Sequence, residues 1–293
     1  FRHNRPTELA IIELTDRIAK AIDKGEYTLG IFLDLSKAFD TINHKILIEK
    51  LEHYGIRGLA QHWFENYLTN RKQIVKYNEV RSKEMTLRTV VPQGSILGPI
   101  LFLLYINDIE NSSKLLSFIL FADDTTISCS NSCLKTLNIT MQTEFNKVSE
   151  WLNVNKLSLN IKKTKFILFT SSNKKPKHEI KLSINDGDIK QVKNTIFLGI
   201  IIDECLTWSE HIAHVVKKIS RASGIIVKIR HFLSRNAMKL IYYALVYPYL
   251  IYGNLIWGNT YKSRVQKLLN VQKKIIRLIT FKSYLEHAEP IFK

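Results

Sequence analysis

The sequence is poor in cysteine, and what cysteine it has is not arranged for cross-linking. Only three of 293 residues are cysteine, namely Cys129, Cys133 and Cys205, and this small odd number excludes a disulfide scaffold. The pair Cys129 and Cys133 has neither CxxC spacing nor a nearby Cys or His partner at zinc-binding distance in the sequence, which argues against a zinc site. The simplest interpretation is a reduced, intracellular chain that is not secreted.

Targeting and membrane signals are also missing. The chain begins with Phe1 rather than Met and has no apolar run in its first ten residues, so we expect an excerpt of a longer polypeptide without a signal peptide. The uncharged stretch Leu240–Tyr261 has the length of a membrane helix. Because Pro248, Gly253 and Gly258 interrupt it, a buried helix followed by a turn is favoured over a membrane span.

Acidic residues are scarce in the last part of the chain. The whole sequence has 43 Lys and Arg against 26 Asp and Glu, a net charge of +17, and residues 211–293 hold 15 of these cations with only two acids. Such a basic balance favours nucleic acid as a partner over an anionic membrane surface. Since the pattern also turns helical from about His211, we predict a boundary near residue 205 between an α/β body and a basic helical module.

Hydrophobic periodicity predicts a chain of mixed helices and strands. Helices are predicted over Thr7–Asp23, His44–Tyr54, Leu59–Leu68, Ile96–Ile109 and residues 134–152. Strands are predicted over Tyr27–Leu35, Gln73–Tyr77, Met85–Val91, Leu115–Phe121, Thr125–Cys129, Phe166–Thr170, Ile180–Ile184, Ile189–Val192 and Thr195–Ile202.

Three acids stand at the ends of predicted strands. Asp34 follows the apolar run Ile31–Leu33, and Asp123 and Asp124 form the tip of a predicted hairpin. A carboxylate at the end of a buried strand is costly unless a cation meets it, and the two sites can converge if their strands are neighbours. Magnesium is the natural partner of such oxygen ligands. For the hairpin pair alone, a polar turn is the simpler alternative, because Asp is a favoured turn residue.

A glycine-containing loop, Val91–Pro99, precedes this hairpin. Its glycines allow close backbone approach to a flat or phosphate-bearing ligand, and Gln93 can form hydrogen bonds with one. The alternative is a loop that merely begins the following helix.

Several ordered stretches resemble motifs of reverse transcriptases, in particular those of non-LTR (LINE-type) retrotransposons of the jockey and chicken-repeat-like groups. The stretches are Asp34–His44, Pro92–Pro99, Phe121–Asp124, Leu157–Lys165, Phe197–Gly199, Tyr252–Gly258 and Leu269–Lys274. The resemblance covers nearly the whole chain and implies an α+β fold. It would be a right-hand polymerase palm, an antiparallel sheet packed on helices, with partial fingers (1–26), the palm with finger elements (27–204) and a basic helical thumb-like or connection-like module (205–293).

The resemblance also implies roles for single residues. Asp34, Asp123 and Asp124 match the metal-binding carboxylates, and the backbone carbonyl of Leu35 matches a further ligand of two Mg²⁺ ions, which Mn²⁺ can replace. Lys163 matches a lysine that protonates the pyrophosphate leaving group, although a run of lysines is also typical of a solvated face.

Other positions match the substrate contacts of the family. Phe39 matches the aromatic steric gate beneath the incoming sugar, with a core phenylalanine as the alternative. Gln93 and Gly94 match residues beside the incoming nucleotide and the template. The primer grip corresponds to Phe197, Leu198 and Gly199.

The activity implied by the resemblance is that of an RNA-directed DNA polymerase, a nucleotidyltransferase that uses two metals to join a dNTP to a primer 3′-hydroxyl. Its partners would be an RNA template, a DNA primer and dNTPs, with the nucleus as its site of action and no membrane. Because the preceding finger strands are missing, we expect the excerpt alone to be weak or inactive. The alternatives are a decayed or domesticated RNA-binding scaffold and, less favoured, a nucleotide-cyclising palm enzyme.

Overall fold

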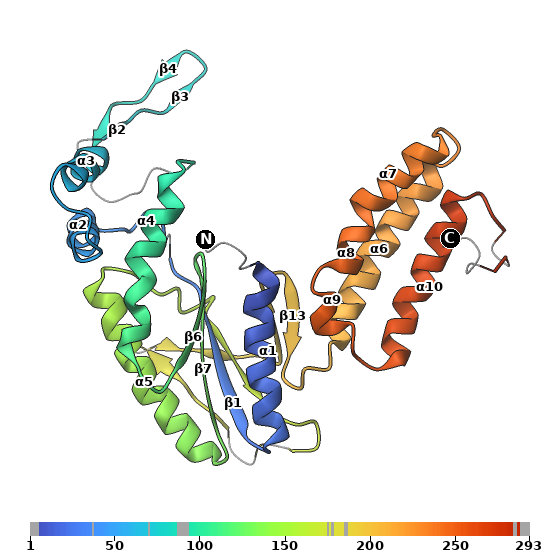
Figure 1. The fold of residues 1–293 in the computed structure, drawn as a ribbon, viewed down its shortest axis with the longest axis horizontal. Coiled ribbons are helices and arrows are strands. Elements are labelled where there is room, and N and C mark those ends of the chain that lie inside the picture. Colours follow the sequence, from blue (N-terminus) through green and yellow to red (C-terminus); the bar gives the residue numbers. More distant parts are fainter. Residues whose placement is uncertain are drawn as a thin grey trace. The chain divides into compact units, whose positions relative to one another are not determined.

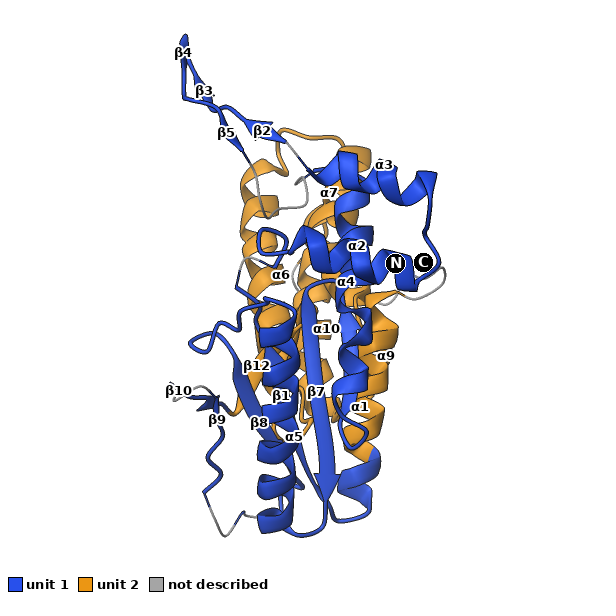
Figure 2. Ribbon diagram, turned by 90° about the vertical axis from the view of Figure 1, so that its left-hand side faces the viewer, with its two compact units in different colours: residues 1–5, 20–192 blue, residues 6–19, 193–293 orange. Residues whose placement is uncertain are grey.

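The computed structural model describes residues 6–36, 38–69, 71–86, 94–174, 176, 179–184, 187–283 and 286–287. The chain forms two compact units, shown in Figures 1 and 2. Unit 1 contains Lys20–Val192, and unit 2 combines Pro6–Ala19 with Lys193–Lys293. The compact units therefore divide at residue 192, earlier than the predicted functional boundary near residue 205, because the hairpin that follows residue 193 packs on the C-terminal helices.

Unit 1 is built on a five-stranded sheet with the order β11-β8-β1-β7-β6. The central strand β1 pairs antiparallel with both β7 and β8, and only β11 is parallel to its neighbour. Nearly every residue of β1 is buried, which explains its continuous apolar sequence. The strands are β1 (Tyr27–Leu33), β6 (Ser117–Phe121), β7 (Asp124–Asn131), β8 (Lys165–Phe169) and β11 (Lys190–Gln191).

Helices complete the core of unit 1, and the predicted α+β class is confirmed. Helix α5 (Leu134–Val154) packs on β1 and β7 through apolar side chains at helical spacing, which are buried. The other helices are α2 (His44–His53), α3 (Leu59–Leu68) and α4 (Leu97–Ile106), which continues as the 3₁₀ segment η1 (Asn107–Ser112). The single helix predicted over Ile96–Ile109 thus ends three residues early and tightens into a different helix type.

Short strand pairs complete unit 1. Two of them, β2 (Lys72–Gln73) with β5 (Met85–Thr86) and β3 (Lys76–Tyr77) with β4 (Val80–Arg81), form one ribbon. A separate small hairpin pairs β9 (Ser183–Ile184) with β10 (Gly187–Asp188). The ribbon lies where the sequence predicts it, with shorter strands, and residues 87–91 of its second predicted strand lie outside the described residues. The hairpin predicted from Ile180–Ile184 and Ile189–Val192 is only partly confirmed, because its second strand is formed by Gly187–Asp188 and the strand within Ile189–Val192 is β11, which pairs with β8.

Unit 2 is helical except for one hairpin. Helix α1 (Thr7–Asp23) begins in this unit, and its bounds are those predicted. Helix α10 packs along α6, and α6 packs on the strand β13. The C-terminal elements are β12 (Asn194–Phe197), β13 (Ile200–Asp203), α6 (Ser209–Ile229), α7 (Arg235–Leu245), α8 (Tyr247–Ile251), α9 (Asn254–Trp257) and α10 (Lys262–Ile279).

The single strand predicted over Thr195–Ile202 is wrong, because the chain reverses in its middle. Leu198 and Gly199 both have positive φ, 46° and 83°. Two successive residues of this kind form the tight turn that suits a two-residue β-hairpin. Gly199 adopts it without strain, whereas Leu198 must be held in place by its surroundings.

The uncharged stretch Leu240–Tyr261 is divided among α7, α8 and α9. Across the part of the chain that the structure describes, every helix is too short or too polar to span a bilayer.

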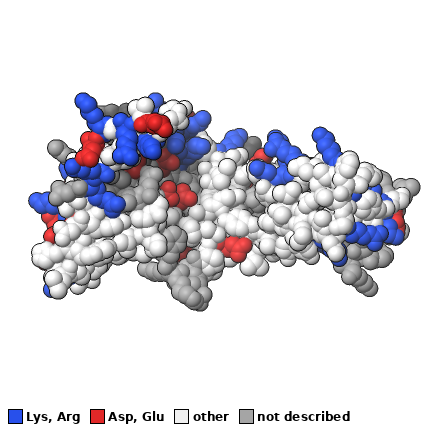
Figure 3. All heavy atoms as spheres, turned by 90° about the horizontal axis from the view of Figure 1, so that it is seen from above, with Lys and Arg blue, Asp and Glu red and all other residues white. Residues whose placement is uncertain are grey.

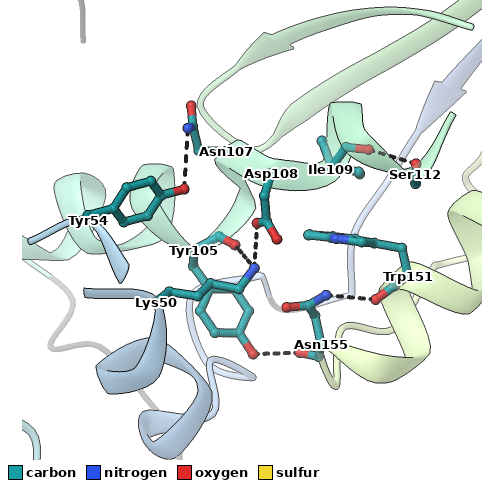
Figure 4. A network of polar contacts seen from close by, with 9 residues as sticks. All are labelled: Lys50, Tyr54, Tyr105, Asn107, Asp108, Ile109, Ser112, Trp151 and Asn155. Atoms are coloured by element: carbon teal, nitrogen blue, oxygen red, sulfur yellow. Dashed lines mark hydrogen bonds and ion pairs between the residues drawn. The ribbon is translucent and has the colours of Figure 1, made fainter. Parts of the chain in front are cut away.

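A buried amine ties α2 to η1 and α5 in unit 1, as Figure 4 shows. Lys50, whose side chain is 14% exposed, donates from Nζ to the Tyr105 carbonyl (2.7 Å) and to the Asp108 carboxylate (2.5 Å). Its Nζ lies 4.8 Å from the centroid of the Trp151 ring. Burial lowers the pKa of Lys50, and the hydrogen bond to Asp108 opposes that shift. The Tyr105 hydroxyl donates to the Asn155 carbonyl at 2.5 Å, which fastens the end of α5.

Two tyrosines of this region provide a matched test of that fastening. Tyr105→Phe leaves the buried Asn155 carbonyl without its donor, so we expect unfolding to require about 1–2 kcal/mol less free energy. Tyr54→Phe removes only an exposed acceptor of the Asn107 side chain and should change stability by less than about 0.5 kcal/mol. Urea unfolding followed by circular dichroism measures both. Equal changes in unfolding free energy for the two variants would show that the buried hydrogen bond contributes no more to stability than the exposed one.

Candidate active site

The register of the sheet brings the acids of two distant segments to one edge of unit 1. Strand β1 pairs with β7 so that Leu33 lies opposite Thr125, and the next residue, Asp34, follows at the level of Asp124. Asp123 and Asp124 lie where β6 turns into β7, a turn made possible by the positive φ of Ala122 (53°). The strand order therefore places three carboxylates at neighbouring strand ends.

The electrostatics of the site follow from that placement. Partial burial raises the pKa of Asp124, and the negative charges of Asp123 and Asp34 raise it further. A carboxyl group responds in this way only when its neighbours are close enough for their charges to interact. On the other side of Asp34, the Lys163 ammonium Nζ lies 4.0 Å from Oδ2, with both groups partly exposed. The edge is thus negatively charged, with one cation at its border.

The backbone around Asp34 is fixed by the loop after α5. The Asp34 carbonyl accepts a hydrogen bond from the Asn160 N–H (2.8 Å), and the Asp34 N–H donates to the buried Thr164 hydroxyl (3.2 Å). Leu35 forms an isolated antiparallel bridge with Leu159, whose hydrogen bonds come from the residues on both sides of Leu35. The Leu35 carbonyl therefore takes no part in the hydrogen bonds that form this bridge. The sequence motif gave no role to Asn160 or Thr164.

The donor set suits a hard divalent cation. Within the described ranges, no group of three or more His, Cys, Asp or Glu side chains is placed so that together it could hold a metal ion. Asp34, Asp123 and Asp124 offer only oxygen atoms, and the repulsion at Asp124 would be relieved by a positive ion, so a metal here would need one or two of these carboxylates and further ligands from elsewhere. Magnesium commonly takes one or two carboxylates and completes its shell with water and substrate phosphates.

Two further predicted positions of unit 1 fall near the start of α4. Phe39 is half-buried and packs its ring on the fully buried Phe102, with ring centroids 4.8 Å apart. Gly94 is exposed and has a φ of 81°, a conformation that favours glycine. Gln93 lies outside the described residues.

The predicted primer-grip residues form the turn between β12 and β13 in unit 2. Phe197 is buried, and the positive-φ pair Leu198 and Gly199 forms the turn itself. The Tyr252 hydroxyl lies 2.5 Å from the Leu198 carbonyl and donates to it, and the Thr7 hydroxyl is 3.2 Å from the same Tyr252 oxygen. A Cβ added to Gly199 would come within 3.3 Å of the Tyr252 ring. The turn is thus held from outside the hairpin.

The same anchor includes the first turn of α1. The Glu8 carboxylate accepts a hydrogen bond from the Gly253 N–H (2.8 Å), and Gly253 has a φ of 65°. Sequence reasoning recognised Tyr252–Gly258 as part of a resemblance but missed its contact with the turn. It placed Thr7 and Glu8 at the start of a helix but gave them no contact with this segment, since only the fold brings residues so far apart in sequence together.

Strand β13 is also fixed to α6. The ring Nδ1 of His211 accepts a hydrogen bond from the Ile201 N–H at 3.3 Å, and burial lowers the pKa of His211 to about 4. The Asp203 carboxylate accepts from the N–H groups of Thr207 (2.9 Å) and Trp208 (2.8 Å) and so shapes the entry into α6. A neutral histidine and a capped loop hold the hairpin against the helices.

An antiparallel sheet packed on helices, with acids gathered where β1 meets the β6–β7 turn, is the architecture of a polymerase palm. The family model described as "Reverse transcriptase (RNA-dependent DNA polymerase)" matches residues 1–202, and the chain belongs to that family. The resemblance found in the motifs is thereby confirmed.

Curated relatives point the same way. The chain is 27% identical over 290 residues to the "Probable RNA-directed DNA polymerase from transposon X-element" of Drosophila melanogaster, covering 96% of this chain and 31% of the relative. It is 25% identical to the "RNA-directed DNA polymerase from mobile element jockey" of Drosophila funebris, with the same coverage of 96% and 31%. The chain spans about a third of the length of these relatives. A solved apo telomerase from Candida tropicalis aligns with 15% identity, a TM-score of 0.46, and coverage of 65% of this chain and 38% of that one.

The repulsion among the acids predicts a pH-dependent stability. The pKa of Asp124 is raised in the folded chain above its ordinary value of 3.8. The folded chain therefore becomes less stable as the pH rises from that ordinary value through the raised pKa, because ionising Asp124 is harder in the folded state than in the unfolded state. Asp124→Asn should therefore stabilise the metal-free chain at pH 7, by only about 0.5 kcal/mol because solvent screens this exposed group, and should give no gain at pH 3.

Thermal unfolding at both pH values, with chelator present, measures this effect. Asp188→Asn, an exposed acid of strand β10, is the control and should give no pH-dependent gain. A gain at Asp124 that is the same at both pH values would show that it does not come from the ionisation of Asp124.

Proposed function

We propose that this chain is the polymerase region of an RNA-directed DNA polymerase, which adds a deoxynucleotide from a dNTP to a primer 3′-hydroxyl under the direction of an RNA template. The observation that carries the proposal is the placement of Asp34 at the level of Asp124, where partial burial and the charges of Asp123 and Asp34 raise the pKa of Asp124. Membership of the reverse transcriptase family supports it. Because the chain spans only part of its relatives, weak activity of the chain alone is part of the proposal.

The acids are proposed to bind two Mg²⁺ ions, with Mn²⁺ as a substitute. Asp34 and Asp123 are the principal ligands, the Leu35 carbonyl is a further one, and Asp124 contributes charge with a less direct contact. When bound, such ions increase the acidity of the primer hydroxyl and neutralise charge on the phosphates. Lys163, partly exposed and bordering Asp34, is positioned to donate its Nζ proton to the departing pyrophosphate.

The remaining predicted contacts keep their proposed roles. Phe39 would exclude a 2′-hydroxyl, since its ring packs on Phe102 and is only partly buried. Gln93 and Gly94 would lie beside the incoming nucleotide and the template, and the turn Phe197–Gly199 would hold the primer end.

The basic helices of unit 2 are proposed to hold the template–primer duplex. A polymerase must grip nucleic acid without reading its sequence, and contacts from Lys and Arg to phosphates provide such a grip. We therefore assign a thumb role to residues 205–293, a palm role to residues 27–204 and a partial fingers role to residues 1–26. The proposed site of action is the nucleus. The cations on α6 and α10 include Lys217, Lys218, Arg221, Lys228, Lys267, Lys273, Lys274 and Arg277.

Primer extension on a homopolymer RNA template tests the catalytic proposal. With Mg²⁺ present, we expect template-dependent DNA synthesis from a chain extended at its amino end, and weaker synthesis from this chain alone. Asp34→Asn or Asp123→Asn should lower the rate roughly a thousandfold, because each removes a ligand used in the transition state. Asp188→Asn should keep full activity, since that residue lies in a separate small hairpin.

The alternative, an RNA-binding scaffold without catalysis, predicts a different result. It requires tight, salt-sensitive RNA binding with no synthesis from the extended chain. Metal binding can be read separately: Mg²⁺ should raise the unfolding temperature of the native chain and raise that of Asp34→Asn less. Equal shifts in both proteins would contradict the proposed metal site.

The anchor of the primer-grip turn gives a further prediction. Tyr252→Phe removes the hydroxyl that donates to Leu198, so we expect KM for the primer–template to rise about fivefold while kcat at saturating substrate is kept. Tyr243→Phe is the control, because Tyr243 is exposed on α7 and makes ring contacts. A loss of kcat with unchanged KM would show that the turn does not act on primer binding.

A further inference from the structure

Helix α3 carries a column of flat side chains that the proposed copying site does not use. Trp63 and Tyr67, one turn apart, stack with ring centroids 5.3 Å apart and planes inclined by only 9°. Arg71, three residues beyond the end of the helix, places its guanidinium carbon 5.0 Å from the centroid of the Tyr67 ring. Trp63, at the end of the column, is 53% exposed. A half-exposed indole on an ordered stack is a ready surface for another flat π system.

The column is held rigidly from behind. The ring of Phe64 meets Trp63 edge-on, with centroids 5.1 Å apart and an interplanar angle of 87°. Phe64 and Tyr67 both pack against the hydrophobic core of unit 1. Because the stack is already formed on a helix, a ligand would lose little free energy in ordering it.

The chain leads from this column directly into the ribbon formed by β2–β5. Every strand residue of the ribbon is exposed, and Figures 1 and 2 show it projecting from unit 1. Tyr77 near its tip is 78% exposed. Between Arg71 and Thr86 the acids are Glu79 and Glu84, against the cations Arg71, Lys72, Lys76, Arg81 and Lys83, and Glu84 pairs with Lys72 at 2.8 Å. Lys and Arg side chains gather over this part of unit 1 in Figure 3.

We propose that Trp63, Tyr67, Arg71 and the ribbon Lys72–Thr86, together called the α3–ribbon surface, bind a single-stranded polynucleotide. Bases would stack on Trp63, and phosphates would lie along the cations of the ribbon. Stacking of this kind needs exposed base faces, which a duplex does not offer, and it tolerates any sequence. The surface goes beyond the proposed function, because these residues belong to neither the acid edge, the primer grip nor the basic helices of unit 2.

Charge favours a polyanion over a protein partner here. The ribbon also exposes apolar side chains such as Val75, Val80 and Met85, which would suit a protein interface. In a two-fold dimer of this chain, however, two copies of a surface with five cations and two acids, a net charge of +3 each, would meet and repel. A phosphate backbone turns those charges into attraction.

The first test is binding of fluorescein-labelled U20 and dT20 to the full chain, measured by anisotropy without dNTPs. Trp63→Leu keeps an apolar side chain but removes the ring, and we expect Kd to rise roughly tenfold. Trp63→Phe should recover most of the affinity, because a smaller ring still stacks. Tyr54→Leu, an exposed aromatic of unit 1 outside the surface, is the control and should leave Kd unchanged. The two oligonucleotides show whether RNA or DNA is preferred.

A second test separates this surface from the basic helices of unit 2. Lys76→Gln with Arg81→Gln should reduce the slope of log Kd against log salt by about 0.7 for each cation removed. RNA that contains 4-thiouridine should cross-link to peptides within residues 59–86, as identified by mass spectrometry.

The proposal is overturned if cross-links fall only in unit 2 and Trp63→Leu binds like the native chain. It is also overturned if Trp63→Leu instead abolishes a concentration-dependent dimer seen by sedimentation, which would make the surface a protein interface. Neither readout needs polymerase activity. A failure of primer extension with intact binding would therefore contradict the proposed function alone, and the reverse result would contradict the α3–ribbon surface alone.

Discussion

The antiparallel pairing of β1 with β7 is the interaction on which the candidate site depends. Its register sets Leu33 opposite Thr125 and so brings the next residue, Asp34, to the level of Asp124. A shift of one residue would move every side chain of β1 to the opposite face of the sheet and undo the packing of both faces, because nearly every residue of the strand is buried. The apolar contacts that stabilise the core therefore also select the register that brings Asp34 to the level of Asp124.

The assembled edge is electrostatically unfavourable without a cation, and the surrounding backbone compensates. Partial burial and, to a smaller extent, the charges of Asp123 and Asp34 raise the pKa of Asp124. Against it, Asp34 is held by the Thr164 hydroxyl and the Asn160 N–H, both from a loop that follows the longest helix of unit 1. The turn in unit 2 is supported in a similar way. Leu198, which has a positive φ, accepts a hydrogen bond from Tyr252, a residue from a different part of the chain. Strain at both places is supported by residues that take no direct part in the chemistry.

Local pattern predicted what is decided locally. The bounds of the helices Thr7–Asp23 and Leu59–Leu68 follow from apolar spacing, and the three acids follow from strand ends and motif. The run Thr195–Ile202 misled because β-branched residues on both sides of Leu198 and Gly199 look like one strand, and a leucine with positive φ gives no signal in the sequence. The contact of Thr7 with Tyr252 depends on packing between distant segments, so no pattern along the chain could show it. The buried Lys50 was missed because a lysine is ordinarily solvated.

The structure also bears on the alternative that Asp123 and Asp124 are only a polar turn. A turn selected for solubility would present its acids to water and away from other negative charges, since Asp is favoured there for its local hydrogen bonding. Here Asp123 and Asp124 lie where β7 begins, and the neighbouring strand β1 is followed by Asp34. The negative charge of Asp34 contributes to the raised pKa of Asp124. Folding gains nothing from this juxtaposition of like charges. Like charges placed in this way cost stability, so the position of the pair is not explained by the needs of a polar turn.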